Sequence, residues 1–359
     1  MIDSADLLQV YGKHIKIKIV ENASKDARIR KIQRYTNTKQ IIDITKPGGS
    51  MELLGHFIAV DARKTQVAAS ASENEKGVVV LAIRGTYTVS GLKADAAGYT
   101  IPFCNGYAHA GIAKRADSLW EKVEDDIVKA LRNNPGYNLI ITGHSLGAGA
   151  AALLSLKLNY KGFLKKIQGL EKVVIRCFAF APPPVFIQSS NDEALVKAMN
   201  NAYAFIHEND CVPFLSISSI RNLAGTLDAV DNFEKGVLKS SPLMAAGLKP
   251  IPDELKQLIC KDRLLPFVPN AHKLAIPAPF VMWMRKVADK DAADLPEYNV
   301  MFCRPQKENE RMGINHLPIL LDKDMISDHM SPQYEQALYS VLRQMISHSG
   351  GDGYVLPSN

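Results

Sequence analysis

The 359-residue sequence predicts an α/β protein with a mostly parallel, doubly wound central sheet and helices on both faces. Between about residues 77 and 207, short β-branched apolar runs alternate with stretches whose apolar residues recur at helical spacing. Such alternation is typical of parallel strands joined by right-handed helical crossovers. The composition, with 47% hydrophobic and 22% charged residues, is that of a globular chain able to bury a core.

The alternating elements follow one another closely. The segment Gly77–Ile83 (GVVVLAI) is typical of a strand buried on both faces. From Ile112 to Leu131 the apolar residues lie on one face of a helix, which Pro135-Gly136 ends. The next expected elements are the strand Leu139–Thr142, the helix Ser145–Leu158, the strand Val173–Phe180, the helix Ala194–Met199 and the strand Ala202–His207.

The regular alternation ends near residue 221. Residues 225–270 contain five prolines and no clear period, so we expect an irregular insertion or cap over the sheet. Late strands are expected within Lys273–Met284 and Glu297–Cys303, and a final helix at Gln333–Met345. The predicted organisation is a basic N-terminal segment packing on the core (1–50), a core domain (51–345) and a flexible tail (346–359).

Charge restricts the expected partners. The net charge is +6, and residues 1–50 contain ten Lys or Arg against five Asp or Glu. A basic face can attract anionic lipid headgroups or nucleic acid. We prefer a solvated segment that covers an edge of the sheet. No nucleic-acid-binding motif accompanies the charge, so we expect no nucleic-acid partner.

The cysteines and apolar runs predict the compartment. Five widely spaced cysteines without a C-x-x-C pair support neither a zinc site nor a disulfide framework. The first residues do not resemble a secretory signal. The apolar stretch Leu274–Met284 is much shorter than the ~20 residues that cross a bilayer. We therefore expect a cytoplasmic protein, at most peripheral on membranes, without a transmembrane segment.

A G-x-S-x-G pentapeptide, Gly143-His144-Ser145-Leu146-Gly147, lies between a predicted strand and an Ala-rich predicted helix. This is the context of the nucleophile elbow in α/β-hydrolases. The flanking glycines are expected because strand and helix leave no room for Cβ atoms around a strained serine. The sequence thus predicts Ser145 as a nucleophile at the carboxyl edge of the sheet.

An alternative interpretation is a dinucleotide-binding loop, because Gly147–Ala152 also matches G-x-G-x-x-A. That loop requires a carboxylate at the end of the following strand. The segment Phe178–Pro182 has none, and the preceding strand ends too early, at Thr142. We instead interpret the glycines as allowing close packing of helix and sheet.

A serine nucleophile needs a base and an acid that orients the base, here expected in the order Ser, Asp, His. Asp210 begins the turn after the strand Ala202–His207, although a helix cap is an alternative role. Of the later histidines, His329 lies in a loop just before the last helix, whereas His272 and His316 have possible structural roles.

An oxyanion intermediate needs two hydrogen-bond donors. The N–H of Leu146 is the first candidate. Thr86, in the turn after Gly77–Ile83, is the second, although an ordinary β-turn would look the same. This chemistry requires no metal ion and no organic cofactor.

Five segments, in order, resemble class three lipases, which have the fungal-type lipase fold, and most resemble the diacylglycerol-lipase-like branch. The resemblance spans about residues 55–340 and also includes Tyr107–Ile112, in which His109 matches a structural position. The five segments are AIRGT (Ala82–Thr86), ITGHSLGAGAAALL (Ile141–Leu154), FAFAPPPV (Phe178–Val185), HENDCVPFLS (His207–Ser216) and DHMSPQYEQAL (Asp328–Leu338).

The resemblance implies a serine lipase that cleaves acyl esters of glycerolipids, with diacylglycerol as the expected substrate. It implies Ser145 as nucleophile, Asp210 as acid, His329 as base and Thr86 as oxyanion residue. It also implies transient contact with a membrane or lipid-droplet surface, and a lid within Val89–Asn105 or residues 225–270.

Two features depart from the family pattern. The resembling animal diacylglycerol lipases carry an N-terminal bundle of membrane spans that is lacking here, and Lys93 and Asp95 follow the RGT segment where the family pattern is more acidic. The sequence leaves open a triacylglycerol lipase, a phospholipase A, a general carboxylesterase and a catalytically silent lipid-binding module.

Overall fold

The structure, a computed structural model, describes residues 25–36, 38, 40–45, 54–61, 77–85, 99–215, 274–287, 297–303, 322 and 324–348. The predicted insertion at 225–270 lies outside these residues. The other lid candidate, Val89–Asn105, is described only from Tyr99 onward.

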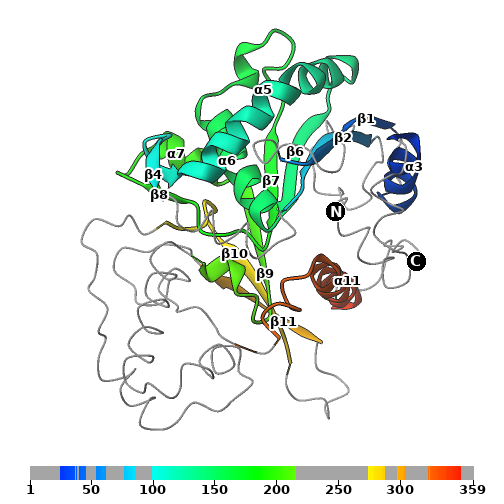
Figure 1. The fold of residues 1–359 in the computed structure, drawn as a ribbon, viewed down its shortest axis with the longest axis vertical. Coiled ribbons are helices and arrows are strands. Elements are labelled where there is room, and N and C mark those ends of the chain that lie inside the picture. Colours follow the sequence, from blue (N-terminus) through cyan, green and yellow to red (C-terminus); the bar gives the residue numbers. More distant parts are fainter. Residues whose placement is uncertain are drawn as a thin grey trace, which may run out of the picture.

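An eight-stranded sheet in the order β1-β2-β3-β6-β7-β9-β10-β11 forms the centre of the molecule (Figure 1). The pairs from β3 through β6, β7 and β9 to β10 are parallel, while β1, β2 and β11 pair antiparallel with their neighbours. The prediction of a mostly parallel sheet is therefore confirmed. The strands are β1 Gln40–Ile44, β2 His56–Asp61, β3 Val78–Ile83, β6 Asn138–His144, β7 Ile175–Phe180, β9 Ala202–His207, β10 Val281–Lys286 and β11 Tyr298–Cys303.

Helices α5 (Ala110–Asn133), α6 (Leu146–Tyr160) and α7 (Glu193–Met199) pack on one face of the sheet. Side chains alternate between the two faces of a strand, so residues 79, 81 and 83 of β3 join the same core cluster as these helices. Because α5, α6 and α7 are the connections between successive parallel strands, this face is built by the crossovers that the sequence predicted.

Two other helices cover the opposite face. Helix α3 (Lys25–Thr36) packs through Ile32 against Val80 and Ala82 of β3. Helix α11 (Ser331–His348) packs through Tyr334 against β7 and β9. Figure 1 shows both helices on the same side of the sheet, away from α5. Helices on both faces are thus confirmed, and those of the second face come from outside the crossover region.

Several elements differ from the sequence prediction. Helix α11 continues to His348, so residues 346–348 are helical and do not belong to the predicted tail. Of the apolar stretch Lys273–Met284, only the end is β10, and an isolated bridge joins Ala275 to Phe186. Within the described ranges, every helix is too short or too polar to cross a bilayer.

A second sheet, not predicted, contains β4 (Thr100–Phe103), β5 (Gly106–His109) and β8 (Phe186–Gln188). The tight turn between β4 and β5 has positive φ values of 43° at Cys104 and 56° at Asn105, as a twisted two-residue hairpin requires. Strand β5 leads directly into α5, where His109 caps the helix by accepting from the Ile112 N–H at 3.4 Å. His109 therefore has a structural role there.

Candidate active site

Ser145 occupies the bend between β6 and α6, where its backbone has φ 58° and ψ −129°. A side chain other than glycine rarely adopts this conformation, and strain of this kind is often found at functional sites. The Ser145 N–H donates to the Phe180 carbonyl at 2.9 Å, which ties the bend to the end of β7. The residue is buried.

The glycines of the pentapeptide are required by close backbone contacts. A Cβ atom at Gly143 would lie 2.4 Å from the Gly147 carbonyl oxygen, and one at Gly147 would lie 2.4 Å from that of Ile83. At Gly149 it would touch Pro183 and Val185 at 3.1 Å. These contacts confirm the predicted reason for the glycines. A separate observation contradicts the dinucleotide-loop alternative: Gly147–Ala152 lies inside α6 and does not form a loop.

His329 lies in the loop before α11 and meets the two other predicted site residues. Its Nε2 is 2.9 Å from Ser145 Oγ. Its Nδ1 is 3.0 Å from both carboxylate oxygens of Asp210. The structure therefore brings together a hydroxyl, an imidazole and a carboxylate from three distant parts of the chain. His272 and His316 lie outside the described residues.

Asp210 is completely buried in the turn after β9. Burial by itself raises the pKa of this carboxyl, but the charge and hydrogen bond of His329 outweigh it, together with donors from Tyr334 and Val212, and the net pKa is lowered. The Tyr334 hydroxyl is 2.6 Å from Oδ2, and the Val212 N–H is 2.9 Å from Oδ1. Asp210 is thus held as a buried carboxylate that faces the His329 ring.

The predicted oxyanion donors are only partly described. Leu146 is the first residue of α6, so its N–H cannot bond within the helix. Among the described residues this N–H has no hydrogen-bond acceptor. Thr86 lies outside the described residues. The preceding Gly85 lies close to the bend, since a Cβ atom there would be 3.1 Å from Ser145 Cβ. The end of the described segment before Thr86 therefore lies beside the serine.

Two side chains at this site were not assigned a polar role from the sequence. Tyr334 donates its hydroxyl hydrogen to Asp210, and burial beside that charge raises its pKa well above 10.0. The His144 ring lies against the His329 ring, with centroids 4.7 Å apart, and burial followed by the His329 charge lowers its pKa to about 3. Both residues lie in the quoted lipase-like segments, and His144 also lies in the G-x-S-x-G pentapeptide, but neither signal predicted these contacts.

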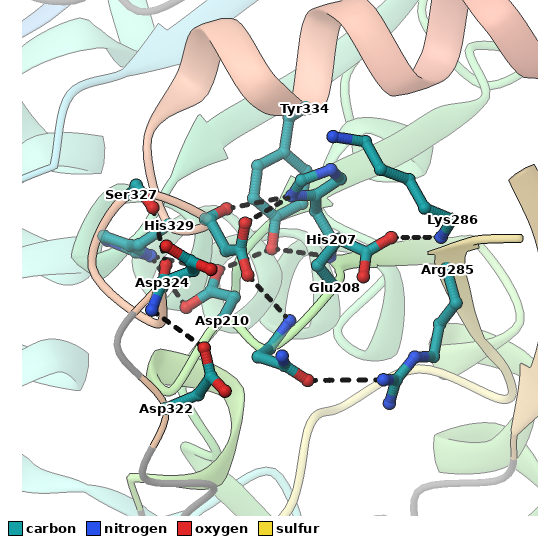
Figure 2. Close-up of polar contacts among 12 residues, drawn as sticks. His207, Glu208, Asp210, Arg285, Lys286, Asp322, Asp324, Ser327, His329 and Tyr334 are labelled. Atoms are coloured by element: carbon teal, nitrogen blue, oxygen red, sulfur yellow. Dashed lines mark hydrogen bonds and ion pairs between the residues drawn. The ribbon is translucent and has the colours of Figure 1, made fainter. Parts of the chain in front are cut away.

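A further hydrogen bond, apart from those among Ser145, Asp210 and His329, joins the turn after β9 to the loop before α11. The Asn209 N–H donates to Asp328 Oδ2 at 3.1 Å. Figure 2 shows His207, Asp210 and Tyr334 grouped beside this loop, with Tyr334 projecting from α11. In the described part of the chain, no group of three or more His, Cys, Asp or Glu residues could hold a metal ion.

The same turn is anchored to β10. Glu208 has a φ of 43°, and its N–H donates to the Met284 carbonyl at 2.9 Å. The Trp283 indole N–H donates to the Glu208 carbonyl at 2.8 Å, and Figure 2 shows the Glu208 carboxylate directed at Lys286. Hydrogen bonds therefore connect the turn that carries Asp210 both to β10 and to the loop before α11.

A comparison with protein families matches residues 80–219 to the family described as Lipase (class 3). Secreted mono- and diacylglycerol lipase A of Penicillium cyclopium is 33% identical over 184 residues, which cover 47% of this chain and 54% of that protein. Diacylglycerol lipase-beta of Mus musculus is 30% identical over 159 residues, covering 42% and 22%, respectively.

The crystal structure of a lipase from Rhizopus microsporus var. chinensis aligns with a TM-score of 0.48 and 14% identity, covering 91% of this chain and 84% of that one. The chain spans about half the length of the Penicillium relative and less of the mouse protein. The matched range contains Ser145 and Asp210, so residues 80–219 of this chain are similar to the class 3 lipase family in the region that carries both side chains.

Proposed function

We propose that the protein is a serine-dependent lipase that hydrolyses the acyl ester bonds of glycerolipids, with diacylglycerol as its substrate. The observation that carries the proposal is the His329 ring, which lies between Ser145 Oγ at 2.9 Å and the buried Asp210 carboxylate at 3.0 Å. The choice of substrate is supported by two relatives that are named as lipases of diacylglycerol.

In the proposed first half-reaction, Ser145 Oγ attacks the ester carbonyl carbon while His329 Nε2 takes the hydroxyl proton. Asp210 stabilises the imidazolium that forms and keeps the other ring hydrogen on Nδ1. The N–H groups of Leu146 and Thr86 hold the oxyanion. His329 then gives its proton to the glycerol oxygen, the C–O bond breaks, and an acyl group remains on Ser145.

In the second half-reaction, water takes the place of the released monoacylglycerol. His329 takes a proton from this water, whose oxygen attacks the acyl carbon and again forms an oxyanion. The intermediate collapses, Ser145 Oγ leaves and receives the proton from His329, and a fatty acid is released. One ester and one water thus give one alcohol and one acid, and the protein is regenerated.

The catalytic roles can be tested with a fluorophosphonate probe, which forms a covalent bond to an activated serine. The wild type is expected to be labelled and Ser145→Ala is not. The exposed Ser118 of α5 offers a matched control, and Ser118→Ala should be labelled like the wild type. Labelling of Ser145→Ala at another serine would contradict the assignment.

The substrate class can be tested with a panel of diacylglycerol, triacylglycerol, phosphatidylcholine and p-nitrophenyl esters. The proposal expects the highest kcat/KM for diacylglycerol and none for Ser145→Ala. Faster cleavage of phosphatidylcholine or triacylglycerol would replace diacylglycerol as the substrate. Lipid binding without any turnover would instead favour a silent lipid-binding module.

We also propose a cytoplasmic location with transient contact to a membrane or lipid-droplet surface. The proposal is supported by the free thiols of Cys104, Cys177, Cys211 and Cys303, of which Cys177 is fully buried. The Penicillium relative is named a secreted protein, so the location is worth testing directly. Cell fractionation should recover the chain in the cytosol and on membranes or droplets, and recovery from the medium would contradict the proposal.

A further inference from the structure

We propose that two histidines, the partly buried His144 and the fully buried His207, are positioning residues that hold the His329 loop by donating to two consecutive main-chain carbonyls. His144 Nε2 is 2.8 Å from the carbonyl oxygen of His329. His207 Nδ1 is 3.2 Å from the carbonyl oxygen of Asp328. This inference rests on the function proposed above, in which His329 is the base.

The direction of both hydrogen bonds follows from their acceptors. A carbonyl oxygen can only accept, so the facing ring nitrogen must carry the hydrogen. Burial lowers the pKa of both histidines, which keeps the rings neutral with a single N–H each. His144 is therefore the Nε2–H tautomer and His207 the Nδ1–H tautomer. The free Nε2 of His207 faces the Tyr298 hydroxyl at 3.4 Å, which can donate to it.

The two histidines connect the loop to the strands that carry its partners. His144 is the last residue of β6 and directly precedes Ser145. His207 is the last residue of β9, in the same turn region as Asp210. At the end of β6, His144 contacts the loop and is followed by Ser145. At the end of β9, His207 contacts the loop and is followed, three residues later, by Asp210. The positions of Ser145 and Asp210 relative to His329 are set by the same two strand ends.

The loop's own hydrogen bonds do not fix its place on the sheet. The Asp328 N–H donates to Asp324 at 2.7 Å, and the Met330 N–H donates to Ser327 at 3.1 Å, so both bonds are internal. The described links to the sheet near the base include the bond from Asn209 to the Asp328 carboxylate and the two histidine donors. Both hydrogen bonds are partly buried, so a carbonyl that loses its donor there is costly, and the loop is then expected to shift.

The Tyr334 ring is close to the rings of both histidines. Its centroid is 5.7 Å from that of His144 and 5.6 Å from that of His207. Its hydroxyl accepts from the main-chain N–H of His207 at 3.1 Å and donates to Asp210. Tyr334 of helix α11 thus packs against both rings. This packing limits the rotation of both rings and keeps their N–H groups directed at the loop.

The test uses amides that replace one ring nitrogen at a time. In His144→Gln the side-chain NH₂ can lie where Nε2 was, and in His207→Asn it can lie where Nδ1 was. His144→Leu and His207→Leu remove the donor. Each full-length variant is assayed for kcat and KM on one ester, for the rate of fluorophosphonate labelling, and for thermal melting.

The leucine variants are expected to lose roughly 10- to 100-fold in kcat and in labelling rate, with KM nearly unchanged. His144→Gln and His207→Asn are expected to stay within about fivefold of wild type, because they restore the donor. The inference would be overturned if the leucine and amide variants at one site lost equally in kcat while their melting temperatures stayed at the wild-type value. A leucine variant with wild-type kcat would do the same.

If a leucine variant does not fold, the exchanged amides His144→Asn and His207→Gln replace it, because they are polar but place the NH₂ at the wrong distance. Equal kcat for the exchanged and matched amides would overturn the inference, and a lower kcat for the exchanged pair supports it. A wild type without Ser145-dependent turnover refutes the proposed function itself. If the wild type is active and substitution of His144 and His207 leaves kcat unchanged, only the positioning role is refuted.

Discussion

Tyr334 donates its hydroxyl hydrogen to Asp210 Oδ2 across 2.6 Å, and the two residues are 124 positions apart in the chain. The same oxygen of Tyr334 accepts from the main-chain N–H of His207 at 3.1 Å. One buried hydroxyl therefore joins α11 to the end of β9 and to the carboxylate that faces His329. In this way, packing of the last helix and the geometry of the site depend on each other.

Removal of this hydroxyl should affect both stability and turnover. In Tyr334→Phe the ring remains, but Asp210 loses a donor and the His207 N–H loses an acceptor. We expect a loss of about 1–3 kcal/mol in the free energy of unfolding and a lower kcat, since unpaired buried polar groups are costly. Urea titration and steady-state kinetics measure the two effects.

The matched control is Tyr339→Phe, which changes a tyrosine on the same helix that is 37% exposed. Its unfolding free energy should stay within about 0.5 kcal/mol of wild type, as is usual for surface substitutions. Equal effects at the two tyrosines would contradict the role given to Tyr334.

Asp210→Asn should preserve the fold but disable the base. An amide in this place can present its NH₂ to His329 Nδ1, which forces the ring hydrogen onto Nε2, so that Nε2 can no longer take the Ser145 proton. We expect kcat to fall by roughly 10³- to 10⁴-fold with little change in KM. Asp117→Asn, at the partly exposed ion pair with Lys157, is the control and should keep wild-type kcat. A near-normal kcat in Asp210→Asn would exclude Asp210 as the acid.

Gly147→Ala should be strongly destabilising because of its surroundings. The new Cβ would lie 2.4 Å from the Ile83 carbonyl oxygen and 2.8 Å from that of Arg84, and both are backbone atoms that cannot move alone. We expect a loss of about 3 kcal/mol or more, and loss of fluorophosphonate labelling.

Gly149→Ala is the comparison within the same helix. Its new Cβ atom would lie 3.1 Å from side-chain atoms of Pro183 and Val185, and not against backbone atoms. The higher helix propensity of alanine, worth about 1 kcal/mol, partly offsets that crowding. Denaturant unfolding should rank Gly147→Ala well below Gly149→Ala, and the reverse order would be inconsistent with the described elbow.

His144 and His207 should make the free energy of unfolding fall as the pH falls. The folded-state pKa of His144 is lowered to about 3 from 6.5, so from about pH 6.5 downward the unfolded chain binds a proton that the folded chain excludes. The unfolding free energy then decreases by up to about 1.4 kcal/mol per pH unit for this residue. The pKa of His207 is lowered as well, which acts in the same direction.

Urea unfolding of wild type and His144→Gln at pH 7 and pH 5 measures this linkage. The variant should show a smaller loss of stability on acidification, by about one proton's contribution, because glutamine does not titrate. Identical losses in the two proteins would mean that His144 is not held neutral in the folded state.

Strongly periodic parts of the fold were predictable from the sequence. The apolar run at β3 and the helical spacing of α5 are local patterns, and both elements appear within a few residues of the expected bounds. Helix α3, strands β1 and β2 and the small sheet were missed. These are short elements with weak patterns, such as QIIDI in β1, and they form because pairing and packing with distant segments stabilise them.

By itself, the sequence determined the bend around Ser145, because that bend depends on neighbours in the chain: a strand, two glycines and a helix start. Local patterns did not distinguish His329 from other histidines or assign hydrogen bonds to Tyr334, His144 and His207. Those contacts join residues between 91 and 185 positions apart. These long-range contacts follow from the tertiary structure, because folding aligns the ends of the parallel strands at one edge of the sheet and places α11 over those strand ends.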